Sequence, residues 1–284
     1  MNDVFIEHNS LEDCEELGLG LDLVFTETPR PPSPEATFST FQGLHKDFRI
    51  KLVGSHPLWG HHLWNSALSV AAYMEQHPNL FVDKNILELG AGGALPSLVA
   101  VEYGARKVLI TDYPDPDLIQ NIEHNVRENI DVNRKDNVAV KGYIWGQSVH
   151  PLLGFLQNNS ISQNSTPADE RDTFDLVILS DLIFNHSQHE ALLKTCDLAL
   201  KSSPASTCSA ASAPSETLHH IIFYTHHRPH LAYRDMEFFE KAKEHGWDSA
   251  ITQKFAPMFP EDPGEEEVRA TVHGWILTRR LISG

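Results

Sequence analysis

The 284-residue chain has few cysteines, few basic residues and no long apolar segment. Its three cysteines, Cys14, Cys196 and Cys208, lie far apart with no paired spacing, which predicts neither a disulfide framework nor a zinc site. The chain has 22 Lys and Arg residues against 39 Asp and Glu residues, a formal net charge of −17. Such an acidic chain is a poor match for nucleic acid, and it favours a positively charged partner or substrate.

Targeting signals are absent as well. No apolar run approaches the length that crosses a bilayer, and the N-terminus is acidic where a signal or transit peptide would be basic. These absences predict a cytoplasmic protein without a membrane partner. The hydrophobic content of 41% is sufficient for a buried core.

Low-complexity segments delimit one domain. The first 28 residues contain eight acidic residues and no Lys or Arg, and four prolines follow closely. Residues 1–45 are therefore interpreted as a mobile acidic, Pro-rich arm. Residues 157–172 and 202–217 are polar, small and without periodicity, which indicates insertions in surface loops. The rest of residues 46–284 has the size of a single α/β domain.

Strand and helix patterns alternate along this domain. Buried strands are predicted by the apolar runs NILELG (85–90), KVLITD (107–112), VAVKGYIW (138–145), FDLVILSD (174–181) and HIIFYTHH (220–227). Helical spacing or capping residues mark the segments 61–78, 94–105, 115–129, 186–201 and 235–247. Two final strands, near 249–259 and 268–281, follow each other without a helix and predict an antiparallel hairpin. The pattern predicts an α/β fold, a Rossmann-like seven-strand sheet that is mostly parallel, with this C-terminal hairpin and helices on both faces.

The segment NILELGAGGALPSLVA (85–100) has a strand, a glycine cluster and a helix, in the order that cradles a nucleotide. It departs from the dinucleotide fingerprint G-x-G-x-x-G, because the last glycine position is Leu95. Glu88, two residues before the loop, would repel a pyrophosphate. S-adenosylmethionine carries a sulfonium and an ammonium group that this carboxylate would favour. We therefore interpret the cluster as an S-adenosylmethionine loop.

Further candidate residues stand at the predicted strand ends, where parallel α/β sheets bind their ligands. Asp112 lies 20 residues beyond Gly92, where an acid can accept hydrogen bonds from both ribose hydroxyls of either cofactor. Trp145 is placed to lie against adenine, and Ser180 or Asp181 to face the methyl donor. Each also has a structural interpretation: a turn former for Asp112, a core residue for Trp145 and a helix N-cap for Asp181.

Five motifs in one order carry a resemblance to a known family: PLWGHHLWNSA, ILELGAGGALPS, VLITDYPDPDLIQNIEHNV, YIWG and LSDLIFNHSQHEALL. They are similar to the seven-strand class I methyltransferases of family sixteen, which use S-adenosylmethionine, from about Leu52 to Leu281. The resemblance implies cofactor contacts for Gly90, Ala91, Gly92, Asp112, Trp145 and Ser180. It also implies a contact for an upstream tryptophan, Trp64 or, as second choice, Trp59. No metal is implied.

Within family sixteen the motifs resemble those of fungal enzymes that methylate the N-terminal amine and a lysine of translation elongation factor 1-alpha. The resemblance therefore implies this protein as the partner. Asp181 is the candidate catalytic residue, which would orient the amine or accept its proton, and His226 and His227 are candidates for a proton relay. Two alternatives stay open, an N-methyltransferase of a small amine such as nicotinamide, and a non-catalytic module that binds S-adenosylmethionine.

Overall fold

The structure is a computed structural model that describes residues 34–157, 173–200, 219–244, 251–254 and 264–278. The first 33 residues of the predicted arm lie outside the described residues. So do the predicted insertions 157–172 and 202–217, apart from Gln157. Among the residues that are described, no helix combines the length and the apolar character that a membrane crossing requires.

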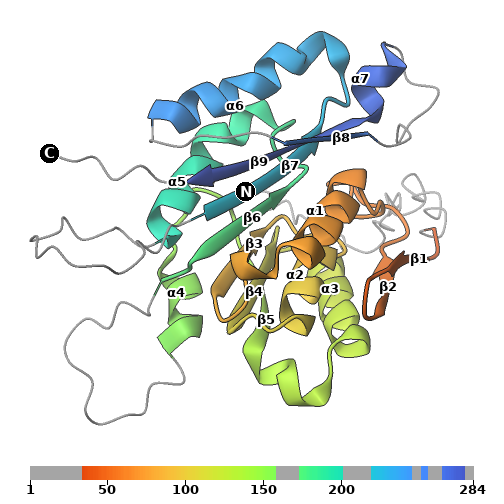
Figure 1. Ribbon diagram of the computed structural model, residues 1–284, viewed down its shortest axis with the longest axis vertical. Helices are drawn as coiled ribbons and strands as arrows, with labels where there is room; N and C mark the ends of the chain where they lie inside the picture. Colours follow the sequence, from red (N-terminus) through yellow and green to blue (C-terminus); the bar gives the residue numbers. More distant parts are fainter. Residues whose placement is uncertain (1–33, 158–172, 201–218, 245–250, 255–263, 279–284) are drawn as a thin grey trace, which may run out of the picture. The chain divides into compact units, whose positions relative to one another are not determined.

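A seven-stranded sheet forms the centre of the fold (Figure 1). Its strands in chain order are β3 (Asn85–Leu89), β4 (Lys107–Asp112), β5 (Val138–Gly142), β6 (Leu176–Ser180), β7 (His219–Thr225), β8 (Ile251–Lys254) and β9 (Thr271–Thr278). In space the order is β5-β4-β3-β6-β7-β9-β8. Strands β3 to β7 pair in parallel, and β9 pairs antiparallel with both β7 and β8. The predicted fold class is confirmed, and β9 enters the sheet between β7 and β8.

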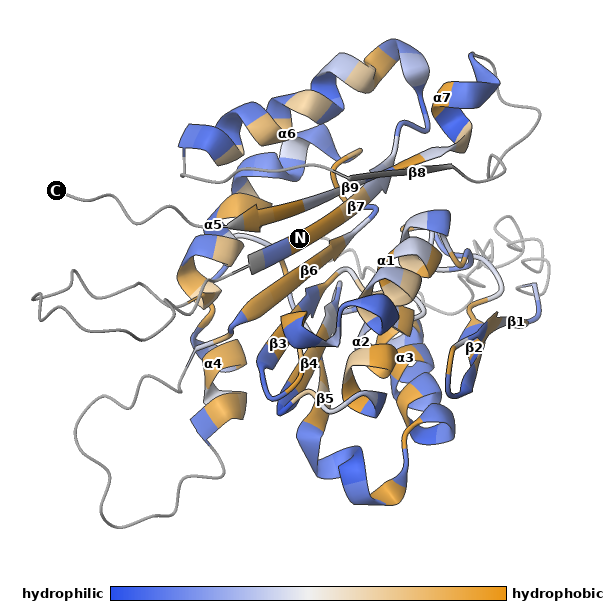
Figure 2. Cartoon of the chain, viewed as in Figure 1, coloured by the Kyte–Doolittle hydropathy of each residue, from blue (hydrophilic) through white to orange (hydrophobic). Residues whose placement is uncertain are grey.

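Helices cover both faces of the sheet, and each layer has its own apolar core (Figure 2). One layer consists of α1 (Asn65–Gln76), α2 (Leu95–Glu102) and α3 (Pro116–Asn129). The other consists of α4 (His150–Gln157), α5 (His189–Ala199) and α6 (Ala232–Glu244). Side chains alternate along each strand, so Ile86 packs into the first core while Leu87 and Leu89 pack into the second. Because both faces are covered, the central strands are continuous apolar runs.

Shorter helices connect these elements. They are α7 (Glu266–Ala270) and the single-turn or two-turn 3₁₀ segments η2 (Pro78–Leu80), η3 (Val132–Asn137), η4 (His186–Gln188) and η5 (Pro229–Leu231). Of the predicted caps, Asp115 is confirmed, since its side chain accepts a hydrogen bond from the Asp117 amide at 2.9 Å. The strand predicted over 138–145 ends earlier, at Gly142. Its one partner, β4, ends opposite Gly142, so no ladder partner exists beyond it.

A separate antiparallel hairpin, β1 (Thr37–Gln42) and β2 (Asp47–Leu52), precedes the sheet. The sequence interpretation placed residues 37–42 in the arm, so its boundary at residue 45 was wrong. Strand β2 buries Phe48, Ile50 and Leu52 in the first core, which ties the hairpin to the domain. The side-chain amides of Asn125 and Asn129 on α3 accept hydrogen bonds from backbone amides of β2, at 2.8 and 2.9 Å. Helix α3 thereby supplies hydrogen-bond partners that a neighbouring strand would otherwise provide.

Candidate functional site

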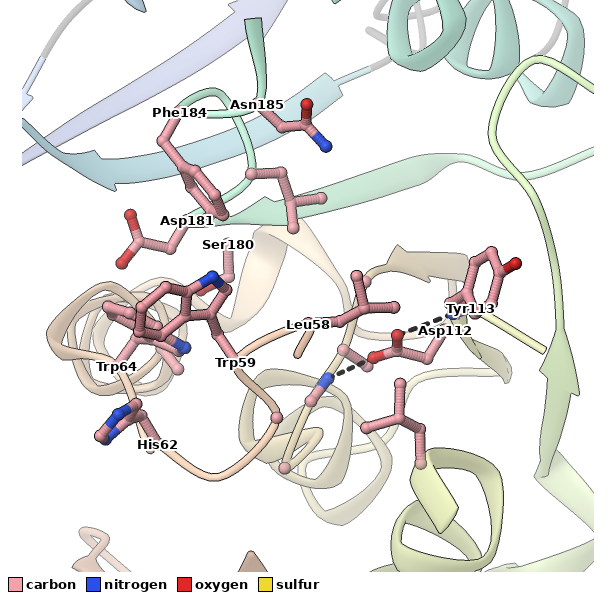
Figure 3. Close-up of a pocket in the computed structure, with 18 of the residues that line it drawn as sticks. Leu58, Trp59, His62, Trp64, Asp112, Tyr113, Ser180, Asp181, Phe184 and Asn185 are labelled. Carbon is pink, nitrogen blue, oxygen red and sulfur yellow. Dashed lines mark hydrogen bonds between the residues drawn. The ribbon is translucent and has the colours of Figure 1, made fainter. Parts of the chain in front are cut away.

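A cavity of about 580 Å³ lies at the carboxyl ends of β3, β4 and β6 (Figure 3). Its volume is in the range of small-molecule and cofactor sites. Nine of the twelve residues that the sequence singled out line it: Trp59, Trp64, Gly90, Ala91, Gly92, Asp112, Trp145, Ser180 and Asp181. The structure thus brings these residues together, as the rule for parallel strand ends predicts. Their contacts with a cofactor remain a prediction.

The glycine loop passes close to two bulky side chains. Gly90 and Gly92 have φ values of +59° and +53°, a region that favours glycine. A Cβ atom on Gly90 would lie 2.7 Å from Leu182 Cδ2 and 3.1 Å from Trp145 Cζ2. The loop is also tied to β4, because the Ala91 amide donates to the Thr111 carbonyl at 3.0 Å. A side chain at Gly90 would therefore collide with Leu182 and Trp145, whereas a Cβ atom on Gly92 would meet nothing within 4 Å.

Asp112 is the acid at the end of β4. It is 9% exposed, and its two carboxylate oxygens accept hydrogen bonds from the amides of Gly92 and Tyr113, each at 2.7 Å (Figure 3). Burial raises the pKa of the carboxyl group, although these two hydrogen bonds favour its ionised form and oppose the shift. Each carboxylate oxygen keeps a further lone pair. Asp112 can therefore accept hydrogen bonds from two neighbouring ligand hydroxyls without releasing the loop.

Glu88, the remaining residue proposed to contact the cofactor, does not line the cavity. It alternates with Leu87 and Leu89 along β3, so its side chain points to the opposite face of the sheet from theirs. There it is fully buried, and its Oε2 accepts a hydrogen bond from the Ser97 amide at 3.2 Å. Burial raises the pKa of Glu88 to about 8, so the group is mostly neutral at pH 7. Glu88 thus lies outside the cavity lining, and its role in the choice of cofactor stays a prediction.

Trp59 and Trp64 lie together at the end of the cavity away from Asp112, beside Ser180 and Asp181 (Figure 3). Their rings meet edge to face with centroids 6.3 Å apart. Trp59 is 45% exposed and has a φ of +63°, which is unusual for a bulky residue. The hydroxyl of Ser180 is buried without a hydrogen-bond partner among the described atoms, so a ligand group in the cavity would satisfy it.

Asp181 links the ends of β6 and β7. Its Oδ1 accepts a hydrogen bond from the Thr225 amide at 3.2 Å, and its Oδ2 lies 3.0 Å from Nε2 of His227. Burial lowers the pKa of His227, but the charge and hydrogen bond of Asp181 outweigh it, so the pKa is raised. The alternative interpretation of Asp181 as a helix N-cap is wrong, since the next α-helix begins at His189 and Asp181 caps no helix there.

The two candidate relay histidines point to different partners. The ring of His227 packs edge to face against Trp64, with centroids 4.8 Å apart, which places the pair with Asp181 beside the aromatic end of the cavity. His226 instead bonds Asp235, outside the cavity lining. The sequence therefore identified both histidines, but only one of them adjoins Asp181.

Sequence reasoning missed part of the cavity wall. Leu58, Tyr113 and Ile144 line it and are about half exposed, and Asn185 and Arg228 add polar groups. These residues lie in the quoted motifs or directly beside strand ends, so their closeness to a predicted strand end or motif was the signal that could have identified them. No group of three or more His, Cys, Asp or Glu side chains in the described part of the chain is arranged to hold a metal ion.

Taken together, the sheet, the glycine loop and the acid after β4 define a class I methyltransferase that uses S-adenosylmethionine. The lining suits this cofactor, because Asp112 offers free acceptor positions, Gly92 leaves room at the loop and the Ser180 hydroxyl lacks a partner among the described atoms. A family model described as lysine methyltransferase matches residues 46–245, and the chain belongs to this family.

Three fungal relatives of this chain carry the name protein N-terminal and lysine N-methyltransferase EFM7. The protein from Cryptococcus neoformans (strain JEC21) is 41% identical, with 96% of this chain and 92% of the relative covered. The protein from Schizosaccharomyces pombe is 40% identical, with 82% of this chain and 83% of the relative covered. The protein from Neurospora crassa is 37% identical, with 93% and 89% covered. The similarity extends over nearly the full length of these relatives.

Proposed function

We propose that the chain transfers methyl groups from S-adenosylmethionine to the N-terminal amine and an adjacent lysine of translation elongation factor 1-alpha. The family and the relatives' name support a protein amine as acceptor. The motif resemblance supports elongation factor 1-alpha as the protein. The observation that carries the proposal is one cavity with a carboxylate at each end, Asp112 beside the glycine loop and Asp181 paired with His227.

The end of the cavity at Asp112 would hold the nucleoside. Asp112 is placed to accept from the ribose hydroxyls, and the open space at Gly92 allows close approach. Trp145, which lies against Gly90, supplies an aromatic surface for the base. Bound S-adenosylmethionine supplies an electrophilic methyl group on a positively charged sulfur.

The end at Asp181 would hold the acceptor amine. An amine attacks only when its lone pair is free and aligned, so the chain must orient it and strip away water and a proton. An α-amine has a reference pKa of about 7.7 to 8.0 and a lysine about 10.4, so the N-terminus is easier to present neutral at pH 7. Asp181 Oδ2 can accept a hydrogen bond from the amine while it remains bonded to His227.

The rim of the cavity favours a protein acceptor over a small amine. Leu58, Trp59, Tyr113 and Ile144 are each between 45% and 51% exposed there, and half-exposed apolar side chains around a site are typical of protein-binding surfaces. The net charge of −17 also suits a basic partner. A cytoplasmic location follows from this proposed partner and stays a prediction.

The test is mass spectrometry of elongation factor 1-alpha with a free N-terminus, incubated with the enzyme and S-adenosylmethionine. We expect methyl groups on the N-terminal peptide, on the α-amine and on a nearby lysine. An unmodified N-terminal peptide under conditions in which the enzyme binds the donor would overturn the proposed acceptor. Methyl groups confined to lysines elsewhere would overturn the N-terminal part of the proposal alone.

A further inference from the structure

A buried carboxylate lies between two histidines behind the acceptor end of the cavity. Asp235, in the first turn of α6, is 3% exposed. Its Oδ1 lies 2.6 Å from Nε2 of His186, and its Oδ2 lies 2.6 Å from Nδ1 of His226. Both imidazole rings are also largely buried, with side chains 8% and 11% exposed. None of these three residues lines the cavity.

The two histidines come from the two loops that form the acceptor end. His186 follows Phe184 and Asn185, which line the cavity in the loop after β6. His226 directly precedes His227, the partner of Asp181, in the loop after β7. A second contact anchors the first loop, since His189 Nε2 lies 2.6 Å from the Ile183 carbonyl. Asp235 is therefore bonded to both loops at once.

These contacts close a ring of bonds around the acceptor end. The loop after β6 runs from Asp181 to His186, and His186 bonds Asp235. Asp235 bonds His226, and the adjacent His227 returns to Asp181. Without Asp235, the hydrogen bonds described between the two loops are those that Asp181 makes to the end of β7 and to His227, and the rings of Phe184 and His227 still meet edge to face. The far part of each loop then loses an anchor, which loosens the arrangement of Asp181, Phe184 and Asn185.

We propose that Asp235 is a positioning residue for methyl transfer, which holds Asp181, Phe184 and Asn185 in the arrangement that receives the acceptor amine. This inference rests on the proposed function, because it requires an acceptor that is bound at this end of the cavity. It concerns only that end. The glycine loop follows β3 and Asp112 ends β4, and none of the hydrogen bonds described for them involves Asp235.

The carboxylate is specific for this task because it accepts two hydrogen bonds at once. Each imidazole donates one N–H to it, and an ionised carboxylate has two equivalent acceptor oxygens. An asparagine has the same shape but only one acceptor oxygen, so in Asp235→Asn one histidine would meet an N–H₂ donor and would have to change its tautomer to accept from it. Both contacts would also lose the charge of the carboxylate, so the two loops would be held more weakly while the packing volume stays unchanged.

The experiment compares two constants for each variant, the KM for elongation factor 1-alpha and the Kd for S-adenosylmethionine from calorimetry. We expect Asp235→Asn to raise the KM for the acceptor protein about tenfold and to leave the Kd for the donor within about twofold. The matched control is Glu237→Gln, which removes an exposed acid from the same helix and should change neither constant. Equal weakening of both constants would show a general structural role and overturn the proposal.

Single substitutions keep the test informative if Asp235→Asn does not fold. His186→Gln and His226→Gln each remove one arm of the ring. Because both arms act through Asp235, the double variant should raise the acceptor KM by clearly less than the product of the two single effects. Multiplicative effects would overturn the coupling through Asp235. If the wild-type enzyme binds the donor but methylates no elongation factor 1-alpha, the proposed function fails. If the wild type methylates it and Asp235→Asn has the same KM for this acceptor as the wild type, only the present inference is refuted.

Discussion

The substitution Asp112→Asn tests the donor end of the cavity. Both carboxylate oxygens of Asp112 already accept backbone amides, from Gly92 and Tyr113. An asparagine keeps the shape, but its NH₂ group would face one of these N–H groups and could not accept from a ribose hydroxyl. At least one hydrogen bond to a charged group is then lost, worth about 1.5 to 3 kcal/mol. At about 1.4 kcal/mol per factor of ten, the Kd for S-adenosylmethionine should rise about 10- to 150-fold.

Calorimetric titration with S-adenosylmethionine measures this change directly. A urea melt of each variant shows whether the protein remains folded at the titration temperature. The control is Asp117→Asn, which neutralises an exposed acid in the first turn of α3 and should bind the donor like the wild type. A folded Asp112→Asn variant with a Kd within threefold of the wild type would refute the assignment of Asp112 to the ribose.

Three further predictions concern the loop and two buried ionisable groups. Gly92→Ala has free space for its Cβ and should cost about 1 to 2 kcal/mol in unfolding free energy for its positive φ alone. Gly90→Ala should cost more and weaken donor binding, because its Cβ meets Leu182; equal costs in urea melts would contradict this. Glu88 has a folded pKa of about 8 against an ordinary value of 4.5, so it disfavours the folded state increasingly from about pH 4.5 to 8, by up to about 1.4 kcal/mol per pH unit. Glu88→Gln should therefore gain stability relative to the wild type between pH 5.5 and 8 in urea melts, and a constant difference would argue against a buried neutral Glu88. The raised pKa of His227 means that its pairing with Asp181 stabilises the fold fully below about pH 6.5 and is lost as the pH rises through the raised pKa. The stability difference between the wild type and His227→Gln should thus be larger at pH 6 than at pH 9, and an equal or inverted difference would refute the pairing.

Local signals were sufficient for the parts of the site that lie at strand ends. Strand β4 has the predicted bounds, and β3 differs from its prediction only by the final glycine. Because carboxyl ends of parallel strands meet at one edge, Asp112, Ser180 and Asp181 could be placed together from their order in the chain. The same rule failed for Glu88, since strand ends are adjacent in space but successive side chains point to opposite faces.

Interactions between distant segments were not accessible in this way. His186 and Asp235 are 49 residues apart, and although His186 lies in a quoted motif, nothing in the sequence pairs it with Asp235. The hairpin β1–β2 depends on amides of α3 that lie about 80 residues further along the chain. The position of β9 between β7 and β8 was not predicted either. Two consecutive strands form the same hairpin whichever of them lies at the edge of the sheet, and the pairing of β9 with β7 is a contact between separate segments of the chain. The acceptor end, which is built from such contacts, could be predicted only as far as Asp181 and His227.

One competition experiment tests the central claim, that the cavity serves a protein amine. The enzyme is incubated with S-adenosylmethionine that carries a deuterated methyl group, together with equal concentrations of elongation factor 1-alpha and nicotinamide. Mass spectrometry then reads the label in the protein and in the small molecule. We expect the label on the N-terminal segment of the protein and none on nicotinamide. Label on nicotinamide, or on neither acceptor while the donor is bound, would contradict the account.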